Sequence, residues 1–249
     1  MALIASIKST GEGINQKNQM SYCLKIAETH TGKVMMAVIA DGWTEQQRGA
    51  IASTYLVERF SHWFETYLPN LSQLGADELI KSQWQDLLRA INQKLLIYGQ
   101  NDDFPLATTI SILLVCESKV AYQMSIGFTP TIKMTGHAYQ FLAGEKQQLA
   151  ITKKAMIASN EQLKDCEFLG LNTTFQMTFN VWTLSEATSF VICSKRFYQQ
   201  VSKQDLLLLF KPTAIQNTGG INKNLDTSML LAQKNSAEVG LAIIVILFQ

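Results

Sequence analysis

The most constraining feature of this chain is a continuous apolar run at residues 34–40 (VMMAVIA), which ends in Asp41-Gly42. A strand in which apolar and polar residues do not alternate is buried on both of its faces. Residues 21–27 (SYCLKIA) alternate as a half-buried strand does, and a turn at residues 30–33 separates the two segments. Two neighbouring strands, one of them covered on both sides, predict a layered domain.

The order of the other predicted elements indicates an α+β fold. Apolar residues recur at spacings of three and four at residues 46–68 and 77–98, which predicts two amphipathic helices, with Gly99 as cap of the second. A near capping box at residues 202–205 opens the leucine-rich segment 206–210. A last helix is expected at residues 225–234, after a loop at Gly219-Gly220. The other segments predict strands joined by short loops typical of antiparallel hairpins, at residues 108–116, 120–126, 130–134, 139–143, 175–184, 190–193 and 239–248.

Length and composition favour a single domain, residues 1–249, with a large core. The chain has 249 residues, 47% of them hydrophobic, and no repeat or linker divides it. A formal net charge of +1, without a Lys/Arg cluster, argues against nucleic acid as a partner. No apolar run reaches the roughly 18 residues that a membrane span needs. The first residues lack the pattern of a secretory signal, so a cytoplasmic location is expected.

The sequence also argues against several kinds of active site. Four scattered cysteines without a C-x-x-C pair favour buried thiols over a zinc site, at Cys23, Cys116, Cys166 and Cys193. No glycine-rich phosphate loop is present, and the three histidines form no Ser/His/Asp pattern. Charged residues make up 16% of the chain, below the roughly 25% of an average soluble domain, which suggests a surface partly covered by a partner.

Asp41-Gly42 is the one local signal of a site. A carboxylate at the end of a strand, followed by a glycine that leaves its carbonyl free, is a familiar way to hold a hard cation. The signal is weak alone, because Asp-Gly is also a common turn dipeptide.

An ordered set of motifs gives this signal a context. Along the chain stand N-Q-M-S-Y-C-L (residues 18–24), A-V-I-A-D-G-W (37–43), G-A-I-A-S (49–53), A-T-T-I-S-I-L-L-V (107–115), Ile126-Gly127, L-G-L (169–171) and F-V-I-C-S (190–194). The set resembles the metal-dependent Ser/Thr protein phosphatases of the PPM (PP2C-like) family, from about residue 15 to the C-terminus. The resemblance implies a four-layer α-β-β-α sandwich. It also implies hydrolysis of phosphoserine and phosphothreonine at a two-metal centre, usually Mg²⁺ or Mn²⁺, that activates water.

Most positions of the family's metal and phosphate site have changed. Where the resemblance places a phosphate-binding Arg and a metal-linked Asp, this chain has Asn15 and Met20. Three further aspartate positions are occupied by other residues, namely Phe128, Lys195 and Ala237. Only Asp41 and the carbonyl of Gly42 remain of the metal ligands. A lysine at a metal position repels Mg²⁺ and can itself pair with Asp41.

These changes predict a catalytically inactive member of the family, a pseudophosphatase that acts as a protein-binding or regulatory module in Ser/Thr phosphorylation signalling. No catalytic residue and no cofactor are then expected. The expected partner is a protein, such as a Ser/Thr kinase, a phosphatase or a phosphoprotein. The rim of the degenerate site, around Trp43, Phe128 and Arg196, is the expected contact surface.

Two alternatives remain open. In the first, the chain is a divergent metal-dependent Ser/Thr phosphatase whose metal site has been rebuilt around Asp41. Glu238 is then the most plausible replacement ligand for Mg²⁺ or Mn²⁺, and the other carboxylates available are Glu12, Glu45 and Asp102-Asp103. In the second, Asp41 is purely structural, a turn residue or the counter-ion of Lys195.

Overall fold

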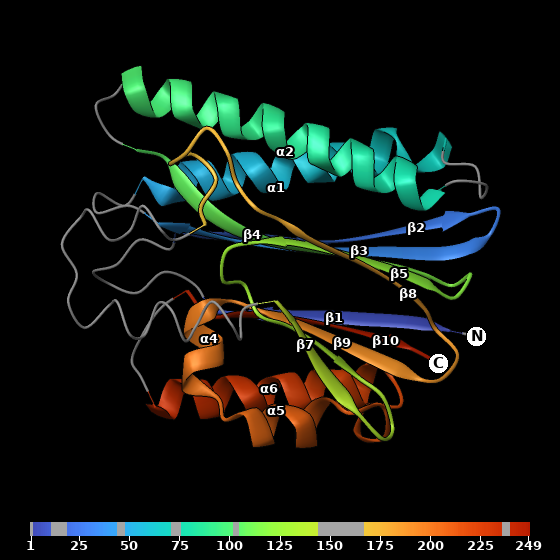
Figure 1. Ribbon diagram of the computed structural model, residues 1–249. Coiled ribbons are helices and arrows are strands. Elements are labelled where there is room, and N and C mark those ends of the chain that lie inside the picture. The colour runs from blue at the N-terminus through green and yellow to red at the C-terminus, as the bar shows by residue number, and fades with distance from the viewer. Residues whose placement is uncertain are drawn as a thin grey trace.

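Two five-stranded antiparallel sheets stack face to face in the computed structural model, and helices cover the outer side of each (Figure 1). The structure describes residues 2–10, 19–43, 48–70, 76–101, 105–143, 167–235 and 240–249. The first sheet has the order β2 (Met20–Thr29), β3 (Gly32–Trp43), β4 (Ala107–Cys116), β5 (Val120–Ile126), β8 (Thr178–Thr183). The second has the order β1 (Leu3–Ser9), β10 (Ala242–Phe248), β9 (Thr188–Cys193), β6 (Thr131–Met134), β7 (Tyr139–Ala143). The predicted α-β-β-α sandwich is confirmed.

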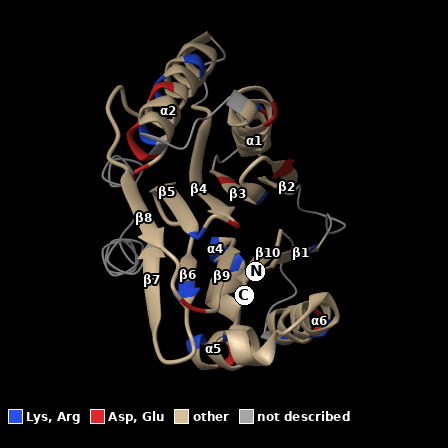
Figure 2. Cartoon of the chain, turned by 90° about the vertical axis from the view of Figure 1, so that its right-hand side faces the viewer, with Lys and Arg blue, Asp and Glu red and all other residues tan. Residues whose placement is uncertain are grey.

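Different sets of helices cover the two sheets. The first sheet carries α1 (Gly49–Thr66), the short 3₁₀ turn η1 (Leu68–Asn70) and α2 (Ala76–Asn101). The second carries α4 (Lys195–Gln200), α5 (Lys203–Phe210), the 3₁₀ turn η3 (Pro212–Ala214) and α6 (Thr218–Asn235). Positive and negative residues are interspersed along α2, whereas the strands are mostly uncharged (Figure 2). No helix within the described ranges has the length and apolar character of a membrane span.

Three hydrophobic cores hold the four layers together. Alternate residues of β3 serve two of them: Met36 and Val38 pack toward the helices α1 and α2, and Met35 and Ile39 pack between the two sheets. The third core lies between the second sheet and the helices α5 and α6. The prediction that residues 34–40 are buried on both faces is therefore confirmed, because all seven residues are at most 3% exposed.

Several predicted boundaries and connections were wrong. β5 does not form a hairpin with β6, because the chain crosses to the other sheet at Gly127. There φ is +71°, and a Cβ would lie 2.4 Å from the carbonyl oxygen of Glu167. Gly99 lies inside α2 rather than at its cap, and Gly219-Gly220 belongs to the first turn of α6. The strand β1 and the helix α4 were not predicted.

Candidate functional site

Asp41 lies near the end of β3, at the edge of the sandwich where β2, β3 and β4 meet. It pairs with Met20 of β2 on one side and with Thr109 of β4 on the other. The strand continues through Gly42 to Trp43, so Asp41 is a strand residue. The alternative that Asp41 is a turn residue is wrong.

Gly42 lies where three backbone segments come into contact. Its N–H donates to the carbonyl oxygen of Gln19 at 3.0 Å. The side-chain oxygen of Gln19 accepts from the N–H of Gly49 at 3.0 Å, and Ser53 Oγ donates to the Gln19 carbonyl at 2.7 Å. A Cβ on Gly42 would lie 2.1 Å from the carbonyl oxygen of Gly49. The end of β3, the start of β2 and the start of α1 are thus locked together at this point, and only a glycine fits.

Two positive charges act on Asp41. Burial of its carboxyl raises the pKa, because loss of water disfavours the charged form, whereas Arg196 and then Lys195 act in the opposite direction. Both cations stand at the beginning of α4, which Ser194 caps by accepting the N–H of Phe197 at 3.3 Å. The sequence had suggested Lys195 and not Arg196 as a charge acting on Asp41, and an ion pair between Lys195 and Asp41 stays a prediction.

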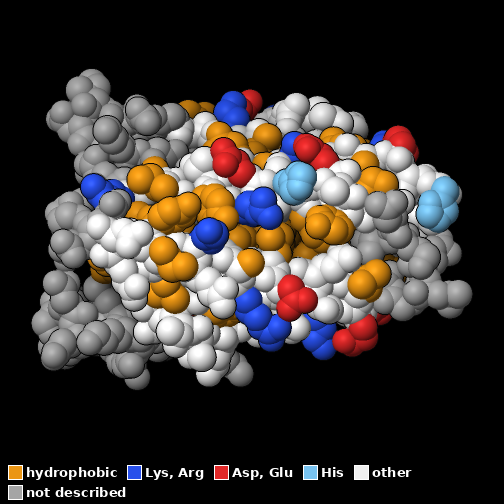
Figure 3. Space-filling model, turned by 90° about the horizontal axis from the view of Figure 1, so that it is seen from above, with side chains coloured by type: hydrophobic (Ala, Val, Ile, Leu, Met, Phe, Trp, Pro, Cys, Tyr) orange, Lys and Arg blue, Asp and Glu red, His pale blue; other side chains and the backbone are white. Residues whose placement is uncertain are grey.

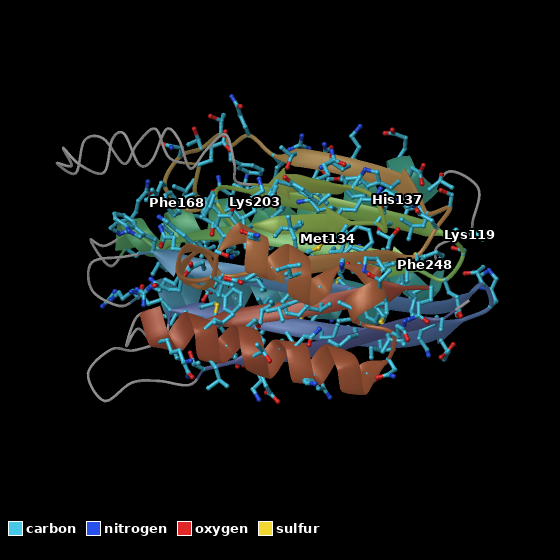
Figure 4. The ribbon with its side chains drawn as sticks, turned by 90° about the horizontal axis from the view of Figure 1, so that it is seen from below. Lys119, Met134, His137, Phe168, Lys203 and Phe248 are labelled. Atoms are coloured by element: carbon cyan, nitrogen blue, oxygen red, sulfur yellow. The ribbon has the colours of Figure 1, made fainter. Side chains whose placement is uncertain are left out.

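The predicted contact surface has to be corrected at Phe128. This ring is 3% exposed and packs edge to face on Tyr198, with 6.0 Å between the centroids, so it is not accessible to a partner. Trp43 is half-buried and lies against Phe168, with centroids 5.7 Å apart, and Arg196 is exposed. Phe168 lies toward one end of the molecule and His137 toward the other, which separates His137 from this rim (Figure 4).

Several sequence-predicted residues lie outside the described residues. They are Asn15, Ala237 and the alternative carboxylates Glu12, Glu45, Glu238 and Asp102-Asp103. The expectation that Glu238 replaces a lost metal ligand therefore stays a prediction.

A row of buried hydroxyl groups beside Asp41 was missed. Thr109 Oγ1 and Thr129 Oγ1 are 2.9 Å apart, and Ser111 Oγ and Thr131 Oγ1 are 2.7 Å apart. Thr109 and Ser111 belong to β4 of the first sheet. Thr131 is the first residue of β6 in the second sheet, and Thr129 lies two residues before it. The signal in the sequence is the spacing of two between Thr109 and Ser111 inside an apolar strand, which places both hydroxyls on one face.

Within the described residues, no three His, Cys, Asp or Glu side chains come together as a metal site. Oxygen ligands, mainly carboxylates, hold Mg²⁺ and Mn²⁺. Met20 is the cross-strand neighbour of Asp41, and the positive charges of Arg196 and Lys195 lower the pKa of its carboxyl against the larger effect of burial.

Comparison with known proteins gives matches at the level of structure. No protein-family model matches the chain, and no curated protein sequence does. Among solved structures, a serine/threonine phosphatase from S. agalactiae has a TM-score of 0.73 at 19% identity, with 99% of each chain covered. Stp1 from Staphylococcus aureus has a TM-score of 0.74 at 17% identity, covering 99% of this chain and 94% of its own. The chain has the PP2C-like phosphatase fold.

One further structure with the PP2C-like fold bears on metals. The catalytic domain of the phosphatase PstP, solved in complex with two manganese ions, has a TM-score of 0.72 at 15% identity, with 99% of each chain covered. At identities this low, the TM-scores establish a common fold and no more. They leave the chemistry of the present chain to be argued from its own residues.

Proposed function

We propose that this chain is a degenerate member of the PP2C-like family, a pseudophosphatase that binds a protein partner and does not hydrolyse phosphate esters. The observation that carries the proposal is the electrostatic environment of the Asp41 carboxyl. Its carboxyl is buried, and Arg196 and Lys195 are the charges that act on it. By the sequence resemblance, Asp41 is the last aspartate remaining from the family's metal ligands.

The physical argument rests on charge. A two-metal site needs several carboxylates, because two dications repel each other and anything positive nearby. Here the two side chains at the start of α4 supply positive charge to Asp41, and a divalent ion would have to compete with them. Met20, opposite Asp41 on β2, adds a thioether where an oxygen ligand would be useful.

The proposed partner is a protein of Ser/Thr phosphorylation signalling, such as a kinase, a phosphatase or a phosphoprotein. We place the contact at the rim formed by Trp43 and Arg196. Trp43 offers a half-buried aromatic ring and Arg196 an exposed cation, and both residue types are enriched where proteins bind proteins. Replacement of Trp43 by Ala is expected to weaken such binding without unfolding the domain.

The competing function is a divergent Ser/Thr phosphatase with a metal site rebuilt around Asp41. It is favoured by the likeness to phosphatases over nearly the whole chain. Glu238 would then act as a replacement ligand for Mg²⁺ or Mn²⁺.

Calorimetric titration with Mn²⁺ and Mg²⁺, together with hydrolysis of an aryl phosphate, separates the two functions. We expect no binding heat and no turnover in the wild type, and the same for Asp41→Asn and for the control Asp226→Asn, whose carboxylate lies exposed on α6. Metal-dependent turnover that Asp41→Asn abolishes and Asp226→Asn preserves would show that the chain is an enzyme.

A further inference from the structure

A groove of about 240 Å³ lies on the outer side of the helical layer over the first sheet, between α1 and α2. Figure 3 shows this face: hydrophobic side chains gather along its middle, with basic and histidine side chains among them. Its lining comes from both helices, with Arg59, His62 and Trp63 from α1, Tyr67 from the C-terminal cap of α1, and Gln83, Asp86 and Leu87 from α2.

Tyr67 and Leu87 form the accessible apolar part of the groove. Trp63 Nε1 donates to Gln83 Oε1 at 2.9 Å, and the indole is only 3% exposed, so it forms the buried floor beneath the groove. The ring of Tyr67 is 49% exposed, and Leu87 is half-buried. Tyr67 and Leu87 can cover an apolar group, and removing that group from water is favourable.

Among the described residues, two charged ones line the groove, Arg59 and Asp86, and only Asp86 has a charged partner. Asp86 accepts from Arg89 at 3.0 Å, so a cation of its own helix already offsets its charge. Arg59 is exposed and has neither an ion pair nor a hydrogen bond with another residue in the part of the chain that the structure describes. A guanidinium beside an aromatic surface is suited to a carboxylate, which it binds through two parallel hydrogen bonds.

The volume limits what can bind. Pockets for drug-sized ligands and cofactors measure roughly 300–1,000 Å³, and this groove is smaller and open to solvent. It suits one large side chain and the groups next to it rather than a whole cofactor.

We propose that the α1–α2 groove is a docking site for a peptide segment of a partner protein, in which a bulky apolar side chain stands next to an Asp or Glu. The apolar side chain packs on Tyr67 and Leu87, and the carboxylate pairs with Arg59. This site is on the outer helical face, apart from the rim at Asp41, and does not depend on whether that rim holds a metal.

The test is a selection of random short peptides displayed against the immobilised full-length protein, followed by fluorescence anisotropy with the best binder. We expect the enriched peptides to combine a large apolar residue with a neighbouring acidic one. Arg59→Glu should weaken binding by about tenfold or more, since it replaces a charge-assisted hydrogen bond with repulsion. Arg59→Lys, which keeps the charge but not the fork of donors, should weaken it less.

Matched controls lie on α6, in the opposite helical layer. Lys223→Glu repeats the charge reversal at an exposed site, and Leu230→Ser repeats the loss of an exposed apolar group that Tyr67→Ser makes in the groove. Both controls should bind the peptide as the wild type does, and all variants should melt as the wild type does because every site is exposed.

Three results would overturn the proposal. One is enrichment of peptides without the acidic and apolar pair. Another is equal affinity for the wild type, Arg59→Glu and Tyr67→Ser. The third is a dimer in sedimentation that Tyr67→Ser dissociates, which would assign the groove to a second copy of this chain.

Discussion

Single residues at the rim of the sandwich determine whether its segments can approach one another. Gly42 is the clearest case, since a Cβ there would lie 2.1 Å from the carbonyl oxygen of Gly49 and 2.6 Å from that of Gln19. These contacts are with backbone atoms, which cannot move aside as the end of a flexible side chain can. The requirement for glycine is therefore independent of any metal.

Gly42→Ala is expected to destabilise the protein by about 3 kcal/mol or more, because the start of α1 has to move and the hydrogen bonds through Gln19 are lost. Urea unfolding measures the change. The control is Gly136→Ala in the turn after β6, where an added Cβ meets nothing within 4 Å. That change should be neutral or stabilising by up to about 1 kcal/mol; equal losses for both variants would contradict the argument.

The partly buried thiol of Cys116 predicts how stability depends on alkaline pH. Burial raises the pKa of Cys116 from 9.0 to about 12. Between these values the unfolded chain releases the thiol proton and the folded chain keeps it, so stability falls as the pH rises above 9. The loss is at most about 1.4 kcal/mol per pH unit.

Cys116→Ala removes this effect. The stability difference between wild type and variant is expected to shrink when urea unfolding is repeated from about pH 8 to about pH 11. Ser118→Ala, in the exposed turn that follows, changes no titrating group, and its difference from the wild type should stay constant. A constant difference for Cys116→Ala as well would refute the assignment.

At the scale of elements, the sequence was informative wherever the pattern is local. β3, β4 and β5 were found because their apolar runs are bounded by turns, and α1 and α2 because their stripes are long. β1 was missed since what makes it a strand is its pairing with β10, across nearly the whole chain. The predicted hairpin from β5 to β6 was wrong, because a short loop such as the one at Gly127 can also carry the chain from one sheet to the other.

The capping box of α5 shows what local pattern can predict in detail. Ser202 caps the helix, and its Oγ accepts the N–H of Asp205 at 3.0 Å. Ser202→Ala should cost about 1 kcal/mol, measured by thermal or urea unfolding. Ser82→Ala, at an exposed position inside α2, is the control and should be neutral or slightly stabilising, because Ala is the better helix former there. Equal effects at both positions would mean that the cap contributes nothing.

The candidate site was predictable only in part, because a local pattern does not show which distant segments of the chain come together. Asp41 follows a recognisable apolar run, whereas Gln19, Gly49 and Arg196 come from three other segments that only the folded chain brings to it. The sequence resemblance located the positions where residues have changed. It could not show that Arg196 acts on Asp41 more strongly than Lys195.

At the scale of the whole molecule, the two sheets are joined by more than apolar packing. Ser111 and Thr131 are both fully buried, and their hydroxyl oxygens are 2.7 Å apart across the inter-sheet space. Gln123 Nε2 donates to the same Ser111 oxygen at 3.4 Å. A hydroxyl buried without a partner is costly, so this pair should fix how the two sheets align.

A double-mutant cycle tests this link between the sheets. Ser111→Ala is expected to destabilise by about 1–3 kcal/mol, because the hydroxyl of Thr131 and the Nε2 of Gln123 both lose this partner. Thr131→Val is expected to cost less, about 1 kcal/mol, because Ser111 Oγ still accepts from Gln123. The double variant should lose less than the sum, by roughly 1 kcal/mol, since no hydroxyl of the pair is then left unpaired. Thr131→Val combined with Ser202→Ala, at a position that shares no partner with it, should be additive within about 0.5 kcal/mol. Additivity in the first cycle would mean that the sheets are aligned by the apolar core alone.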